Sequence, residues 1–195
     1  MLVRLGQEVQ EVPRRLTAPT PDLTDDVIRL EPLTAATHAA EMLELTRDAD
    51  VLRFTRVPAG ADAAFAESWI GRYERGWEDG SRAGFAIVDA NDGSFLGFAA
   101  VVALDLDARE AELGYMVAPQ SRGRGIAGRA VDLLTGWCLD ELGLERLELK
   151  IDPANTGSTK VAERSGYRLE GVLRNTHVKE GLRADVGVWS RLRQD

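Results

Sequence analysis

The stretch from Leu113 to Ala127 changes character twice along its length. An alternating apolar pattern gives way to a turn that contains Gly123 and Gly125, and Ile126 then begins a helical repeat. The first amides of a helix have no intrahelical partner and carry the positive end of the helix dipole. Because glycine lets a ligand approach the backbone closely, this strand–turn–helix unit predicts a site for a diphosphate.

Alternating strand patterns precede this turn and are joined by short polar segments. Residues 84–88 and 95–104 flank Asn91-Asp92-Gly93, a sequence typical of a β-hairpin. A third pattern at 111–117 follows the polar turn at 105–109. Strands joined by turns this short must run antiparallel to one another, so the segment predicts the antiparallel part of a sheet.

Helical patterns lie on both sides of these strands. Thr34 is expected to cap a helix that ends near Thr46, and Asp62 a longer helix that Gly80 ends. The aromatic residues of the longer helix recur every four positions, which favours core packing over the lining of an acceptor pocket. They are Phe65, Trp69, Tyr73 and Trp77.

After the turn, an amphipathic helix from Ile126 is expected to end at Gly143, followed by a strand at 147–151. Asn155 is expected to cap another helix, and two strands near 167–175 and 184–192 complete the pattern. The order of elements predicts an α+β fold with a mixed, mostly antiparallel sheet of about seven strands, flanked by helices.

The chain of 195 residues is long enough for one domain with a substantial core. Residues 1–25 contain Pro13, Pro19 and Pro21 and show weak periodicity, which indicates an N-terminal extension. Patterning is continuous afterwards, so residues 26–195 are expected to form the single domain. No apolar run approaches the roughly 20 residues that span a bilayer, and no secretory h-region opens the chain, so we expect a cytoplasmic protein that does not enter a membrane.

Charge and cysteine content exclude several kinds of site. A formal net charge of −8 argues against a general nucleic-acid surface, whereas Arg122, Arg124 and Arg129 fall close together beside the turn and favour an anion there. Cys138 is the only cysteine, so it forms no internal disulfide, and its apolar helix face indicates a buried thiol. The histidines show no metal-ligand spacing, so no bound metal is expected.

Two motifs of the chain carry a resemblance to a known family. Arg122-x-x-Gly125-x-Ala127 resembles the Arg/Gln-x-x-Gly-x-Gly/Ala signature of the GCN5-related N-acetyltransferase (GNAT) superfamily. Asn155-Thr156-Gly157-Ser158, followed by Gly166-Tyr167, is similar to the second CoA-binding segment of that superfamily. The resemblance covers roughly residues 27–192. It extends to the ribosomal-protein N-terminal acetyltransferase (RimJ/RimL-like) branch through the C-terminal residues Glu170 to Arg174, Asp185 and Trp189.

The resemblance implies a GNAT fold whose sheet is splayed in the middle, between the strands at 111–117 and 144–151. Pantetheine would lie in that gap, the pyrophosphate on the turn, and the amine acceptor on the opposite side. Acetyl-CoA, or another acyl-CoA, is the implied co-substrate, with no metal. The implied acyl-CoA contacts are Met116, Val117, Arg122, Gly123, Arg124, Gly125, Ile126, Ala127, Asn155 and Ser158.

The resemblance also directs attention to residues that could move protons. Glu112 lies on the strand that enters the gap, and His177 lies near the acceptor side, so both are candidate general bases. Asp185 is a third candidate general base, and its position favours a structural role in which it orders the last hairpin. Many relatives protonate the leaving thiolate with a tyrosine at the position held here by Ala162, which leaves Ser158 as the nearest substitute. An amide of Met116 or Val117 is the expected oxyanion donor.

The function expected from this combination is transfer of an acetyl group from acetyl-CoA to a primary amine, by direct attack in a ternary complex. The expected acceptor is a protein N-terminus or a small-molecule amine. The assembly state is left open, with a homodimer as one alternative. A non-catalytic acyl-CoA sensor is the first alternative, because the usual tyrosine is missing. A dinucleotide-binding oxidoreductase is the second, because Gly123-x-Gly125-x-x-Gly128 satisfies that fingerprint. The antiparallel strands that precede the turn count against the second alternative.

Overall fold

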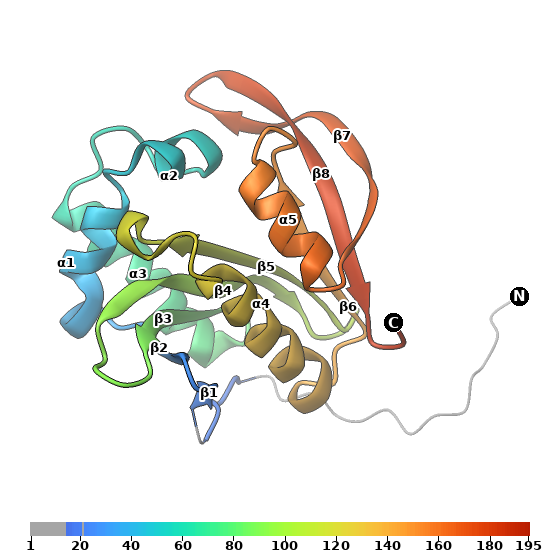
Figure 1. Ribbon diagram of the computed structural model, residues 1–195, viewed down its shortest axis with the longest axis horizontal. Helices are drawn as coiled ribbons and strands as arrows, with labels where there is room; N and C mark the ends of the chain where they lie inside the picture. The colour runs from blue at the N-terminus through green and yellow to red at the C-terminus, as the bar shows by residue number, and fades with distance from the viewer. Residues whose placement is uncertain (1–14, 21) are drawn as a thin grey trace, which may run out of the picture.

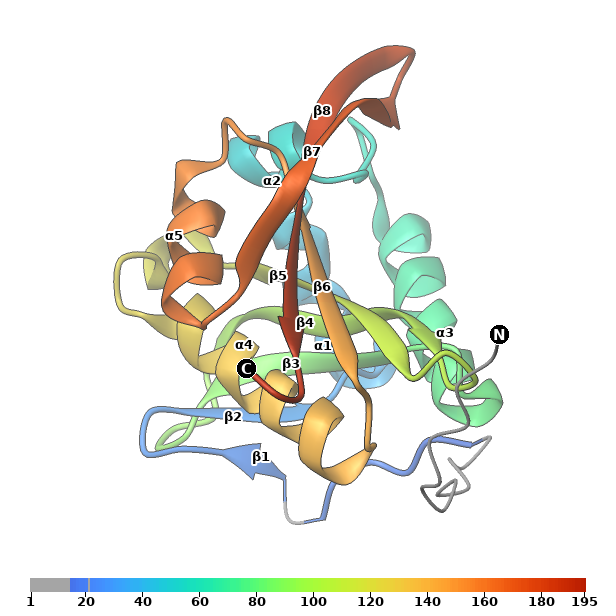
Figure 2. The same ribbon diagram turned by 90° about the vertical axis from the view of Figure 1, so that its right-hand side faces the viewer.

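A computed structural model describes residues 15–20 and 22–195. In this part of the chain, eight strands form one sheet in the order β1-β2-β3-β4-β5-β6-β8-β7 (Figures 1 and 2). The strands are β1 (Leu23–Thr24), β2 (Ile28–Pro32), β3 (Ala83–Asp89), β4 (Phe95–Asp105), β5 (Glu110–Val117), β6 (Arg146–Ile151), β7 (Arg168–Lys179) and β8 (Leu182–Leu192). The α+β class is confirmed, and the strand beyond the expected seven is the two-residue β1.

The helices occupy two faces of the sheet. They are α1 (Ala35–Leu45), α2 (Ala49–Phe54), α3 (Ala63–Asp79), α4 (Ile126–Gly136) and α5 (Thr156–Arg164), with a 3-10 turn at Pro119–Ser121 and a π-helical turn at Trp137–Glu141. Figure 1 shows α4 and α5 in front of the sheet and α1 and α3 behind it. The central strands are therefore covered on both sides, which explains why β3 is almost continuously buried.

Alternating residues of the central strands serve two cores. Phe85 of β3 and Leu113 of β5 pack with Leu134 on the α4 side, whereas Ala86 and Phe98 pack with α1 and α3 on the other. This arrangement follows from the strand geometry, in which successive side chains point to opposite faces. The aromatic stripe of α3 takes part in this packing, since Tyr73 is buried against Phe98 with ring centroids 5.2 Å apart.

The helix starts follow the expected signals with one difference. Asp62 accepts a hydrogen bond from the Phe65 amide at 2.9 Å, and Gly80 ends α3 with a φ of 75°. Thr34 precedes α1, but its side chain makes no capping hydrogen bond. Its amide instead donates to Nδ1 of the buried His38 at 3.1 Å, so a side chain one turn into the helix bonds the Thr34 amide.

The sheet opens between β5 and β6. These two strands are the parallel pair of the sheet, and their pairing runs from Glu110 opposite Arg146 to Leu113 opposite Leu149. Beyond that point Gly114 to Val117 pair only with β4, while Lys150 and Ile151 pair only with β8. The expected splay is confirmed, and it begins after the fourth pair. A sheet with one parallel pair is not the doubly wound parallel sheet that a dinucleotide site requires.

Residues before the expected domain start also contact the core. Leu16 is buried, and its amide donates to the carbonyl oxygen of Trp77 at 3.1 Å. The part of the expected extension at residues 1–14 and 21 lies outside the described residues. Among the residues that are described, no helix is both long and apolar enough to cross a membrane.

Candidate active site

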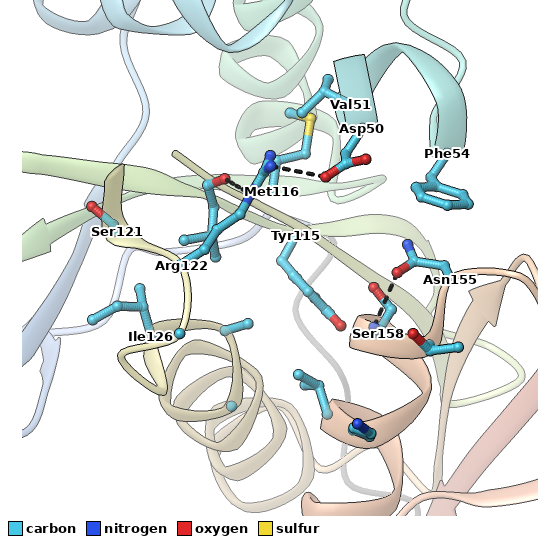
Figure 3. A pocket seen from close by; sticks show the side chains of 18 of the residues that line it. Asp50, Val51, Phe54, Tyr115, Met116, Ser121, Arg122, Ile126, Asn155 and Ser158 are labelled. Atoms are coloured by element: carbon cyan, nitrogen blue, oxygen red, sulfur yellow. Dashed lines mark hydrogen bonds and ion pairs between the residues drawn. The ribbon is translucent and has the colours of Figure 1, made fainter. Parts of the chain in front are cut away.

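A cavity of about 620 Å³ lies where the sheet opens. Its walls come from the end of β5, the glycine-rich turn, the start of α4, helix α2 and the start of α5 (Figure 3). Segments that are far apart in sequence thus converge on the end of the gap between β5 and β6. The size suits an extended cofactor arm together with a small acceptor group.

The glycine-rich turn presents free backbone donors to this cavity. Gly123 and Gly125 adopt φ angles of 74° and 79°, which glycine tolerates and other residues rarely do. Gly125 is the N-cap of α4. Among the described residues, none accepts a hydrogen bond from the amides of positions 123–127. These amides, with open space at both glycines, fit the diphosphate of a CoA-type ligand.

The arginine side chains beside the turn pair with carboxylates. Arg122 pairs with Asp48 and, at 3.0 Å, with Asp50. Arg129 pairs with Asp25 at 2.7 Å. Arg124 lies 3.9 Å from Asp89 and is half exposed. The sequence suggested that these guanidinium groups add charge to a phosphate site. In this structure each has an acidic neighbour, so the backbone amides are the unpaired donors at the turn.

The end of β5 has unpaired backbone groups on the side that faces β6. Met116 and Val117 pair with Phe98 and Gly97 of β4, and they have no partner on the β6 side. A side chain at Gly97 would come within 2.3 Å of the Met116 carbonyl oxygen, so glycine is required for this close approach. Met116 and Val117 both line the cavity, so they stay candidate contacts to a pantetheine arm and to an oxyanion.

The start of α5 forms the opposite wall. Asn155 accepts a hydrogen bond from the Ser158 amide at 3.1 Å and so caps this helix. Both residues line the cavity (Figure 3). Ala162, one turn further along, is fully buried in the core. The position at which many relatives carry a tyrosine therefore has no group that could donate a proton.

The three candidate bases lie in different settings. Glu112 is half-buried and forms an ion pair with Lys150 at 2.7 Å, one residue before the strands separate. Burial, with the charges of Arg56 and Lys179, lowers the pKa of His177, and Asp152 partly offsets this. Glu112 and His177 are both absent from the cavity lining, whereas Ser158 belongs to it.

Asp185 has the structural role that the sequence favoured. Its Oδ1 accepts a hydrogen bond from the Asn175 amide at 3.0 Å. Asn175 has a φ of 58° at an irregularity in the β7–β8 pairing, so the carboxylate stabilises a strained point of the hairpin.

The structure adds lining residues that the sequence did not single out. Helix α2 contributes Asp50, Val51 and Phe54 to one wall. Tyr115 of β5 points between α4 and α5 toward Ser158 (Figure 3). Burial raises the pKa of Tyr115 to about 12, and the neighbouring Ser158 side chain lowers it by a smaller amount. Alternation along β5 places Tyr115 on the face of Leu113, which indicates burial but gives no hint of an adjoining cavity.

Comparison with known proteins agrees with this geometry. A family model described as an acetyltransferase (GNAT) domain matches residues 28–168. The chain is 32% identical over 146 residues to YdaF of Bacillus subtilis (strain 168), a putative ribosomal N-acetyltransferase, covering 74% of this chain and 77% of that protein.

Two solved structures have a similar fold. RimL, a ribosomal L7/L12 α-N-protein acetyltransferase in complex with coenzyme A, aligns with a TM-score of 0.77 at 18% identity, covering 86% of this chain and 95% of that chain. The acetyltransferase MccE, in complex with acetyl-CoA and AMP, aligns with a TM-score of 0.78 at 22% identity, covering 86% and 93%. The family match spans well over half of the sequence, and the chain therefore belongs to the GNAT family and is an N-acetyltransferase.

Proposed function

We propose that this N-acetyltransferase moves the acetyl group of acetyl-CoA to the α-amine of a protein or peptide N-terminus, by direct attack in a ternary complex. The observation that carries the proposal is the row of free amides at positions 123–127, which opens onto the cavity at the parting of β5 and β6. The pyrophosphate binds these amides, and pantetheine follows the unpaired edge of Met116 and Val117.

The acetyl carbonyl then lies at the end of β5. The amide of Met116 or Val117 donates a hydrogen bond to the oxyanion that forms when the amine attacks the thioester carbon. A preorganised donor of this kind contributes about 3 kcal/mol to the lowering of the barrier. The N-terminus of α5, with Asn155 and Ser158, holds the other side of the pantetheine arm.

The need for a neutral amine favours an α-amine acceptor over lysine. Deprotonation at pH 7 costs about 1.4 kcal/mol for an amine of pKa near 8, but about 4.6 kcal/mol for a lysine of pKa near 10.4. A lysine therefore requires a committed base within reach of the nucleophile. Here Glu112 is engaged by Lys150, and His177 is outside the cavity lining, so the site suits an amine that needs modest help.

The likeness to YdaF, whose name records a putative ribosomal substrate, supports a protein N-terminus as acceptor. A small-molecule amine is the second candidate acceptor. A sensor that binds acyl-CoA without turnover would share the loop geometry and lack a productive acceptor.

An acceptor screen that follows release of free thiol from acetyl-CoA tests the proposal. Peptides that begin with Ser, Ala or Thr should release thiol, whereas the same peptides with a blocked N-terminus and an internal lysine should not. Activity confined to a polyamine or an aminosugar would overturn the peptide assignment. Tight CoA binding without thiol release on any amine would instead point to the sensor.

A further inference from the structure

Tyr115 carries a buried hydroxyl that the fold leaves without a partner. Its side chain is mostly buried between α4 and α5, and it lines the cavity (Figure 3). The hydroxyl oxygen is shielded from solvent and has the Ser158 side chain as a polar neighbour, yet no hydrogen bond of ordinary geometry joins it to any described residue. Buried polar groups are nearly always satisfied, and this hydroxyl lies at a cavity wall, where a ligand can complete it.

The other buried tyrosines behave differently. The Tyr167 hydroxyl lies 2.8 Å from Oγ1 of Thr135, inside the core. Tyr73 packs on Phe98 from helix α3, away from the cavity lining. Among the described tyrosines, Tyr115 is the one that reaches the wall of the cavity.

The reaction calls for a hydrogen-bond donor to the departing thiolate. When the C–S bond of a thioester breaks, its electron pair stays on sulfur, and a thiolate against a protein wall is less well solvated than one in bulk water. A nearby hydrogen-bond donor offsets this loss of solvation. Ala162 provides none. Ser158 carries a hydroxyl at the cavity wall, and Tyr115 beside it is a second donor.

We propose that the Tyr115 hydroxyl donates a hydrogen bond to the sulfur of acyl-CoA and stabilises the departing thiolate, an inference that rests on the proposed function. The C–N bond forms as the amine attacks, the C–S bond then breaks, and the electron pair moves to sulfur. The amine loses one proton to a base or to water. The thiolate gains one proton from water after release, so the phenol proton stays on Tyr115 throughout.

The protonation state of the phenol agrees with this role. Burial raises the pKa of Tyr115 to about 12, so the hydroxyl is protonated over the whole working range of pH. A thiol has a pKa of about 8.5, and its thiolate is too weak a base to remove that proton. Tyr115 therefore acts as a donor to sulfur and not as an acid that is consumed and restored in each cycle.

The test compares Tyr115→Phe with Tyr73→Phe in the full chain. Both variants remove one hydroxyl from a tyrosine that packs against the core, and only the first alters the cavity wall. We expect Tyr115→Phe to lower kcat for acetyl-CoA by about tenfold to a hundredfold with little change in KM, and Tyr73→Phe to keep the wild-type kcat. Circular dichroism and melting curves confirm that both variants are folded.

A second donor separates a chemical role from a structural one. The selenoester analogue of acetyl-CoA has a more acidic leaving group, which needs less stabilisation, so the penalty of Tyr115→Phe should shrink clearly with that donor. An equal penalty with both donors, or a wild-type kcat for Tyr115→Phe, would overturn the inference while leaving the enzyme an acetyltransferase. Absence of turnover by the wild-type chain would contradict the proposed function itself.

Discussion

The carboxylate of Asp48 is shared between the first turn of α2 and the guanidinium of Arg122. Its Oδ1 accepts hydrogen bonds from the amides of Asp50 and Val51 at 3.1 and 3.0 Å, and Arg122 pairs with the same oxygen. Burial raises the pKa of Asp48, but hydrogen bonds from Arg122 and Val51 outweigh it and hold that pKa below its usual value. One side chain thus joins the glycine-rich turn to the helix that walls the cavity.

Replacement of Asp48 separates its two roles. Asp48→Asn keeps an N-cap acceptor and removes the charge, whereas Asp48→Ala removes both. We expect Asp48→Ala to lower the free energy of unfolding by about 1 to 2 kcal/mol and Asp48→Asn by less than about 1 kcal/mol, since the Arg122 pair is partly exposed. Urea denaturation measures both. Equal losses would assign the stabilisation to the ion pair and none to the cap.

Backbone conformation at the turn predicts a contrast between two glycines near the ends of α4. Gly125 has a φ of 79°, and an added side chain meets nothing within 4 Å, so Gly125→Ala is penalised by strain of about 1 kcal/mol and not by collision. The dissociation constant of the Gly125→Ala variant for acetyl-CoA should rise roughly fivefold, because relief of the strain turns the backbone amides of the turn away from the pyrophosphate. Isothermal titration with acetyl-CoA measures the change.

Gly136→Ala is the matched control for this measurement. Gly136 is helical with a φ of −56°, also has open space, and lies outside the cavity lining. Alanine there should stabilise the fold by about 0.5 to 1 kcal/mol and leave the affinity for acetyl-CoA unchanged. A similar loss of affinity in both variants would show that the conformation of Gly125 is irrelevant to binding.

Local patterns predicted most of the fold because local rules produce it. The hairpin at Asn91 to Gly93 and the antiparallel strands around it follow from turn chemistry and alternation. The strand β1 was missed because two residues carry no measurable periodicity. The Thr34 cap differed because His38, a buried side chain one turn later, bonds the Thr34 amide.

The site was less accessible to sequence reasoning because its walls come from distant segments. The turn at 123–127 was visible as a motif, and its open amides follow from helix geometry. The partners of Arg122 lie 72 and 74 residues away, so no local pattern shows that its charge is already paired. Tyr115 reads as an ordinary buried strand residue until the opening between β5 and β6 is known.

The pH dependence of catalysis tests whether His177, which lies outside the cavity lining, accepts the amine proton. Burial and the charges of Arg56 and Lys179 hold the pKa of His177 below its ordinary value of 6.5, so the imidazole is neutral at pH 7. The value of kcat/KM falls below about pH 8 because the α-amine acceptor becomes protonated, and a histidine base would add a second fall below pH 6.5. Because His177 does not line the cavity, we expect His177→Gln to keep kcat/KM at pH 7 within about threefold of the wild-type value, whereas loss of a general base would lower it by about a hundredfold.

Glu112→Gln provides the comparison for the histidine variant. Because Glu112 is held by Lys150, its replacement should change the electrostatics of the gap without abolishing the acid limb. Measurement of kcat/KM from pH 5 to 9 for both variants decides between them. A loss of about a hundredfold in Glu112→Gln, with little change in His177→Gln, would assign the base role to Glu112.

Stability at high pH should depend on Tyr115. Its pKa is about 12 in the folded chain and about 10 when the chain is unfolded, so the folded state binds the phenol proton more tightly. The associated stability is fully present below pH 10 and is lost as the pH rises toward 12, by about 2 to 3 kcal/mol.

Tyr115→Phe lacks this loss, and near neutral pH it should be as stable as the wild type or more so, because a buried unpaired hydroxyl is removed. Urea denaturation from pH 7 to 11.5 should therefore show the wild type losing stability faster than Tyr115→Phe above pH 10. Parallel curves would mean that the Tyr115 hydroxyl is solvated or hydrogen-bonded in the folded chain. The inference that this hydroxyl is free to donate to the thioester sulfur would then be contradicted.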